Sequence, residues 1–280
     1  MNLIRWILAK QLLILALFST LLTGTTQAGN ENAPDSTIPA PASAPLHVDP
    51  LDEGRASAMH RGPDPHSKLS PQQQISVALK HFKEGRLPQA LAVMDQTIAR
   101  NPQNADLHHV RATLYLANDD NTAALSNIEQ AVKLNPSDPL YRVTRAQIYL
   151  KFERVEEAMA DLDEAVALNP DLVPARFNRG TLLTYQEQYY KALEDFDRCI
   201  AVEPHLPAPY FNRGAVFYAL GELLLAQEDI RRFIEISDVE EWKQSGRDLL
   251  KAWGDAEATS EGAAASANQA AGQAYEQGMQ

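Results

Sequence analysis

Arginine and aspartate recur at a fixed interval in the middle of the chain, and they are the residues best suited to pair charges. The positions that share this interval are Arg111, Arg145, Arg179 and Arg213, together with Asp161, Asp195 and Asp229. A row of guanidinium groups could grip acidic ligands, since each presents a planar fork of donors. We favour a structural ladder, in which each arginine pairs with the carboxylate of its own unit, because losing one partner would leave the other charge partly buried.

Histidines are the next residues that could carry chemistry, and their spacing argues against it. His47, His60 and His66 lie at irregular intervals in a proline-rich stretch, without carboxylates or cysteines placed to complete a metal site. His108 and His109 are adjacent, so on a helix they point to different faces. We therefore predict that the protein binds no metal.

The single cysteine and the lack of catalytic motifs point the same way. Cys199 cannot form an intramolecular disulfide or a cysteine-built zinc site, and we expect a buried, unreactive thiol. The sequence has no recognisable combination of serine, histidine and carboxylate, and no glycine-rich phosphate loop. It therefore predicts no catalytic residues, no cofactor and no enzymatic activity.

Composition limits the kinds of partner. The 280 residues are 45% hydrophobic and carry a formal net charge of -12. Binding to nucleic acid or to anionic lipid without sequence specificity needs a net basic surface, so neither is expected. Prolines crowd residues 29–70 and alanines crowd residues 255–280, so a hydrophobic core must come from the middle of the chain.

Residues 1–28 have the three-part layout of a secretory signal peptide. Basic residues come first, an apolar run occupies residues 11–22, and the small Thr26 and Ala28 stand before a cut at Gly29. The run is shorter than the roughly 20 residues of a membrane-spanning helix, and no cysteine follows it to carry a lipid anchor. We predict an exported, periplasmic protein with no membrane span after cleavage; an uncleaved signal that anchors the chain to the inner membrane is the alternative.

Two flanking segments are predicted to be disordered. Residues 29–70 form a proline-rich linker with few large apolar side chains. Residues 255–280 form an acidic tail rich in alanine and glutamine, with no apolar stripe that could dock a helix.

A repeat of constant length fills the chain between these flanks. The segments TIARNP, AVKLNP, AVALNP and CIAVEP end at equally spaced prolines, Pro102, Pro136, Pro170 and Pro204. Small residues recur at the eighth place of each unit and large apolar residues at the twenty-fourth, and the spacing continues into a fifth unit without its final proline. The five units are residues 71–104, 105–138, 139–172, 173–206 and 207–240.

This pattern resembles that of the tetratricopeptide repeat family, and the resemblance covers residues 71–240. It implies an all-α fold, a right-handed α-solenoid of five helix-turn-helix repeats of about 34 residues each. Residues 241–254 are predicted to form a C-terminal capping helix, since Trp242, Leu249 and Trp253 lie on one stripe.

The same resemblance implies that the first helices line a concave groove. Transferred place by place, the predicted partner-binding residues are Gln147, Phe177, Asn178, Thr181, Tyr185, Phe211, Asn212 and Tyr218. Asn178 and Asn212 share the place where related proteins hold the backbone of an extended peptide, because an amide both donates and accepts. A purely structural role for these two asparagines stays open. The asparagine that a carboxylate clamp needs is missing from the ninth place, so acidic C-terminal peptides are not expected.

The resulting hypothesis is a non-catalytic scaffold or adaptor of the cell envelope that binds one or more envelope proteins or peptides in this groove. A self-associating structural protein of the periplasm is the first alternative, and an enzyme is a less favoured one. The first alternative would make the chain a homo-oligomer.

Overall fold

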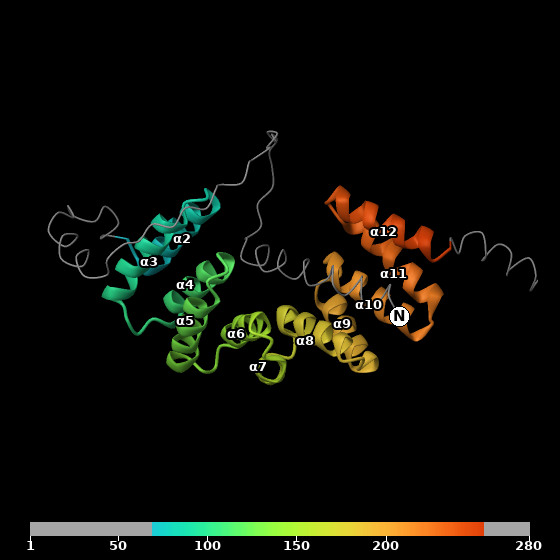
Figure 1. Ribbon diagram of the computed structural model, residues 1–280, viewed down its shortest axis with the longest axis horizontal. Helices are drawn as coiled ribbons and strands as arrows, with labels where there is room; N and C mark the ends of the chain where they lie inside the picture. Colours follow the sequence, from blue (N-terminus) through green and yellow to red (C-terminus); the bar gives the residue numbers. More distant parts are fainter. Residues whose placement is uncertain (1–68, 255–280) are drawn as a thin grey trace, which may run out of the picture. The chain divides into compact units, whose positions relative to one another are not determined.

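The computed structural model describes residues 69–254, and every regular element in this range is an α-helix (Figure 1). The helices are α2 (Pro71–Lys83), α3 (Leu87–Arg100), α4 (Ala105–Ala117), α5 (Asn121–Leu134), α6 (Pro139–Lys151), α7 (Val155–Leu168), α8 (Val173–Tyr185), α9 (Tyr189–Val202), α10 (Pro207–Leu220), α11 (Leu223–Ile236) and α12 (Glu240–Ala252). The predicted all-α fold of paired helices is confirmed. The predicted signal peptide, almost all of the predicted linker with its three histidines, and the predicted tail lie outside the described residues.

The described helices belong to two compact units that divide between Pro102 and Gln103. In the first unit, α2 and α3 pack on each other, with Ala78, Ala90 and Met94 fully buried. In the second unit, α4 to α11 form four more helix pairs, and α12 packs on α11.

Side chains and prolines fix where the helices begin. Ser70 and Gln73 form a capping box at the start of α2. Asn104 and Asp138 each accept a hydrogen bond from a backbone N–H in the first turn of the following helix, at 3.0 and 2.9 Å. Pro139 then occupies the first position of α6, where a missing N–H costs nothing.

The turn inside each helix pair uses a residue with left-handed backbone at the fifteenth place of the unit. Asp119, Glu153 and Glu187 have φ of 56°, 58° and 59°, and Gly85 and Gly221 take the same conformation in the first and last pairs. The N–H groups of Asp119 and its successor bond back to α4 carbonyls at 3.0 Å, which closes the helix as a Schellman motif. The sharp reversal therefore comes from one backbone conformation that every pair repeats.

Small residues at the eighth place let the two helices of a pair approach closely. A Cβ added to Gly180 would lie 3.0 Å from the ring of Phe196, the large residue on the facing helix. Gly214 is similarly close to Ile230, at 3.2 Å from its added Cβ, whereas Ala112 and Ala146 take this place in the second and third units. The fit of small against large is what packs each pair to interior density.

Neighbouring pairs in the second unit meet through two kinds of contact. Each second helix packs on the first helix of the following pair, and the first helices α4, α6, α8 and α10 each approach the next one along the chain. The first helices therefore form the inner row of this unit. The last pair is covered by α12, and Leu249 of this helix and its C-cap residue Trp253 join a buried cluster with Phe211 and Phe233.

Candidate partner-binding surfaces

Within three of the pairs, the predicted ladder residues lie in contact across the two helices. Each arginine of the first helix donates two hydrogen bonds to one carboxylate of the second. These pairs, with their N···O distances, are Arg145–Asp161 (2.7 and 2.7 Å), Arg179–Asp195 (2.8 and 2.8 Å) and Arg213–Asp229 (2.8 and 2.7 Å). Arg111 donates a single bond of 2.6 Å to the Asn127 amide oxygen. The two-point geometry fixes the relative orientation of the two helices as well as pairing their charges.

The ladder also runs from one pair to the next through acidic residues that the sequence analysis missed. Arg179 Nη1 donates to Asp163 of the preceding pair at 3.0 Å, and Arg213 Nη1 donates to Asp197 at 2.6 Å. These aspartates share the twenty-fifth place of their units, where Glu129 stands one unit earlier. These residues could have been found from the sequence, because they recur at the same repeat interval, two places after Asp161 and Asp195.

Burial makes these carboxylates depend on their partners. Asp195 is 1% exposed and accepts a further bond of 2.7 Å from Arg176, whereas Asp229 is 4% exposed and pairs only with Arg213 among the residues described. Hydrogen bonding to Asp195 raises the pKa of Arg179 above its usual range, so this guanidinium is charged at any working pH. Because the guanidinium groups of Arg145, Arg179 and Arg213 already donate to these aspartates, few of their N–H groups are available to an acidic ligand.

The predicted groove residues lie on the first helices, but they differ in how much they offer to a partner. Phe177, Asn178, Thr181, Phe211 and Asn212 are buried, Gln147 and Tyr218 are half-buried, and Tyr185 is exposed. Phe177 packs against Phe196 with ring centroids 6.1 Å apart, and Phe211 against Phe233 at 5.0 Å. These two phenylalanines therefore contribute to the hydrophobic core of their helix pairs.

Polar groups of neighbouring first helices are joined at two of the three boundaries between α4 and α10. Between α4 and α6, His109 Nε2 lies 2.8 Å from Thr144 Oγ1. Between α8 and α10, the Asn212 amide donates to Thr181 Oγ1 at 3.1 Å.

The boundary between α6 and α8 is different. Gln147 and Asn178 stand at the places that Thr181 and Asn212 occupy one unit later, yet neither side chain has a hydrogen-bond partner among residues 69–254. Asn178 is 7% exposed, so its amide is held by packing while its polar tip stays unpaired. An extended peptide could satisfy both amides with its own N–H and C=O groups.

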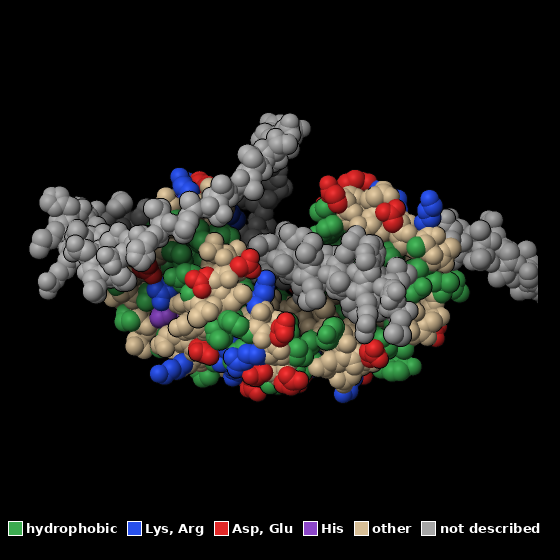
Figure 2. Space-filling view, viewed as in Figure 1, with side chains coloured by type: hydrophobic (Ala, Val, Ile, Leu, Met, Phe, Trp, Pro, Cys, Tyr) green, Lys and Arg blue, Asp and Glu red, His purple; other side chains and the backbone are tan. Residues whose placement is uncertain are grey.

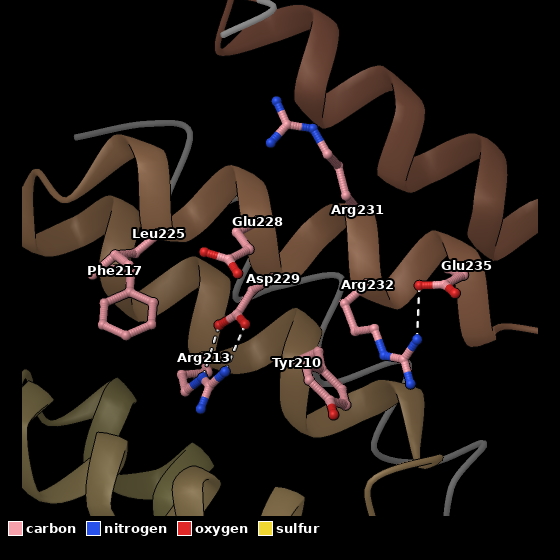
Figure 3. Close-up of a pocket in the computed structure, with 9 residues that line it drawn as sticks. All are labelled: Tyr210, Arg213, Phe217, Leu225, Glu228, Asp229, Arg231, Arg232 and Glu235. Carbon is pink, nitrogen blue, oxygen red and sulfur yellow. Dashed lines mark hydrogen bonds and ion pairs between the residues drawn. The ribbon is translucent and has the colours of Figure 1, made fainter. Parts of the chain in front are cut away.

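A separate hollow lies beside α10 and α11, with a cavity volume of about 670 Å³ (Figure 3). Tyr210, Phe217 and Leu225 supply its apolar lining. The remaining lining is charged with both signs, and Figure 3 shows that Asp229 and Glu235 are already held by Arg213 and Arg232. The lining therefore combines apolar side chains with two ion pairs, Arg213–Asp229 and Arg232–Glu235.

Two of the residues that could carry chemistry, Cys199 and His109, lie in buried surroundings. Cys199 is fully buried, and burial raises the pKa of its thiol to about 12, assisted by the nearby Asp195. Burial lowers the pKa of His109, against the opposing effect of Asp138 and Asp106, so the ring is neutral at pH 7. No group of three potential metal ligands occurs within residues 69–254, and no helix in that range is long and apolar enough to cross a bilayer.

The paired helices, the charge ladder and the inner row of first helices define the class of protein, an α-solenoid of helical hairpins. Residues 109–173 match the family model of the tetratricopeptide repeat. Together with the repeat and the fold, this match identifies a tetratricopeptide-repeat region in the chain. No curated protein sequence matches the chain.

Solved structures of the same fold are similar to the chain over most of their length. PilW, a widely conserved type IV pilus biogenesis factor, is 22% identical with a TM-score of 0.60, over 68% of this chain and 89% of PilW. A thermophilic TPR protein in Thermus thermophilus is 19% identical with a TM-score of 0.56, over 65% and 99% of the two chains. The pilF protein of Pseudomonas aeruginosa is 18% identical with a TM-score of 0.55, over 65% and 90%. At these identities the likeness establishes the fold.

Proposed function

We propose that this protein is a non-catalytic scaffold that binds an extended segment of a protein partner along its inner row of first helices. The observation that carries the proposal is the pair of unpartnered amides, Gln147 and Asn178, in the middle of that row. Gln147 is half-buried and Asn178 is 7% exposed, and a bound peptide backbone pairs with both amides whatever the side chains of the peptide are. Asn212 plays a structural part instead, because its amide is already bonded to Thr181.

We place this activity in the cell envelope. Support comes from the predicted signal peptide of residues 1–28 and from the fold shared with PilW, a pilus biogenesis factor. Residues 69–254 hold no cluster of potential metal ligands, and the titratable groups of the ladder are paired, which favours binding over catalysis.

Site-specific photo-cross-linking in intact cells tests the groove. A photoreactive amino acid at Gln147 is expected to give a defined adduct with a partner, whereas the same group at Ala160, exposed on the second helix α7, is not. Asn178→Ala should weaken partner binding by about 1 kcal/mol, roughly fivefold, without lowering the melting temperature. Asn212→Ala serves as the matched control and should lower the melting temperature.

Equal adducts from positions 147 and 160, or binding unchanged by Asn178→Ala, would remove the groove from the function. The alternative of self-association is separated by light scattering on the mature chain. A mass that stays monomeric as concentration rises excludes self-assembly as the main role.

A further inference from the structure

A patch of exposed apolar side chains lies where the second helices of the last two pairs begin. We call it the turn-edge patch, made of Tyr190, Leu223, Leu224 and Leu225. Tyr190 is 75% exposed and Leu224 is 67% exposed. These two residues share the eighteenth place of consecutive units, and α9 packs on α10, so the two helix starts lie on the same edge of the solenoid. Figure 2 shows hydrophobic side chains reaching the surface over α11.

The fold does not require apolar residues at this edge. The eighteenth place holds Thr122 in the second unit and Glu156 in the third, and both of those helix pairs are formed normally. Large exposed apolar side chains that no packing demands are typical of a surface that meets a partner.

Charged residues around the patch restrict what that partner is. Glu187, Glu222 and Glu228 are exposed beside it, and none of the three forms an ion pair within residues 69–254. Two basic residues are near these carboxylates: Lys191, which donates to the Gln188 side chain at 2.9 Å, and Arg231, which is exposed and lines the hollow that also contains Leu225.

This charge argues against two occupants. A second copy of the chain, docked by the same patch around a two-fold axis, would bring the unpaired glutamates of both copies together. An anionic lipid surface would be repelled by the same carboxylates. A protein segment that carries basic residues beside an apolar stripe would be attracted to them.

The hollow beside the patch extends the apolar surface. Leu225 belongs to both, and Figure 3 shows it next to Phe217 on the wall of the hollow. A side chain projecting from a segment that lies on the patch would find an apolar recess there, which is how a helix is anchored in a groove.

We propose that the turn-edge patch is a second docking surface, separate from the inner groove, for an amphipathic helix of a partner protein whose apolar stripe is flanked by lysine or arginine. Its binding depends on Tyr190 and Leu224 and does not depend on Asn178. The two surfaces together let the solenoid hold two protein segments at once.

The test uses the full chain and a synthetic helical peptide of about 18 leucine and lysine residues with leucine on one face. Isothermal titration is expected to show binding that falls by about tenfold or more in the double variant Tyr190→Thr, Leu224→Glu, because both substitutions remove apolar surface that the peptide would bury. Thermal unfolding checks that the variant is folded, since its new residues are those that the second and third units carry at this place. Asn178→Ala should bind the peptide as the natural chain does.

Four results would overturn the proposal. They are equal binding by the double variant, equal binding of a peptide with its leucines spread around the helix, equal binding of a version with glutamate for lysine, and co-sedimentation of the natural chain with anionic vesicles. A dimer that the double variant abolishes would instead make a second copy the occupant. None of these results bears on Asn178, so the groove proposal stands or fails separately.

Discussion

The arginines of the ladder contribute unequally to the free energy of unfolding, because the aspartates they bind differ in their number of partners. Asp195 accepts bonds from both Arg176 and Arg179, while Asp229 relies on Arg213 alone among the residues described. Removing one partner from a buried pair leaves an uncompensated charge, and that penalty is larger than the net worth of the pair itself.

We therefore expect Arg213→Ala to cost about 3–5 kcal/mol of unfolding free energy and Arg179→Ala about 2 kcal/mol, since Arg176 still holds Asp195 in the second variant. Urea unfolding measures both. Arg198→Ala, at an exposed pair with Asp171, is the control and should change the free energy by less than about 1 kcal/mol. A loss of partner binding by Arg179→Ala with an unchanged melting point would show that the ladder serves ligand binding.

At the scale of the elements, the turn inside each pair sets the hairpin, and its conformation suits glycine. Asp119, Glu153 and Glu187 hold a positive φ that an L-residue adopts only with strain, whereas Gly85 and Gly221 adopt it freely. Three of the five hairpins therefore carry a small backbone strain energy. The glycines at the same place in the first and last hairpins show which residue would relieve it.

Glu153→Gly is expected to raise the free energy of unfolding by up to about 1 kcal/mol, because relief of the left-handed strain exceeds the added entropy of the unfolded chain. The melting temperature measures it. Glu156→Gly, three residues on in the first turn of α7, is the matched control and should be destabilising. A melting temperature lowered equally by both changes would contradict the strain argument.

For the second unit as a whole, α12 closes the end of the stack. Trp253 is 7% exposed and stacks on Tyr218 with ring centroids 4.5 Å apart. A solenoid is stabilised by each repeat and its neighbours, so damage at one end is felt most near that end.

Trp253→Ala should cost about 3–5 kcal/mol, with the loss concentrated in residues 207–254. Hydrogen exchange is expected to show faster exchange in α10 to α12 and nearly unchanged protection in α4 and α5. Lys251→Ala, at an exposed residue in the last turn of α12, is the control. Protection lost equally along α4 to α12 would mean that the unit unfolds as one block.

The constant repeat interval was enough to predict the helix pairs and which arginine and aspartate meet, because equal spacing places them equally in every unit. It could not predict how the groove residues differ. Asn178 and Asn212 have the same place and neighbouring sequence, but only Asn212 has a threonine hydroxyl within reach on the previous first helix. Likewise, the Phe177 ring packs against the Phe196 ring of the facing helix and is buried there. Periodicity within one helix does not predict such a contact between two helices.

The ladder also determines where a further repeat unit could be added to the chain without breaking the contacts between pairs. A unit copied between the second and the fifth would bring both an arginine for the pair before it and an acidic residue for the pair after it, as Asp163 and Asp197 do now. The fifth unit has Arg231 where those aspartates stand, so a sixth arginine-bearing unit placed after it would meet a like charge. An inserted internal unit would keep the ladder continuous, whereas a unit added after the fifth would meet Arg231 and would also have to displace α12 from the last pair.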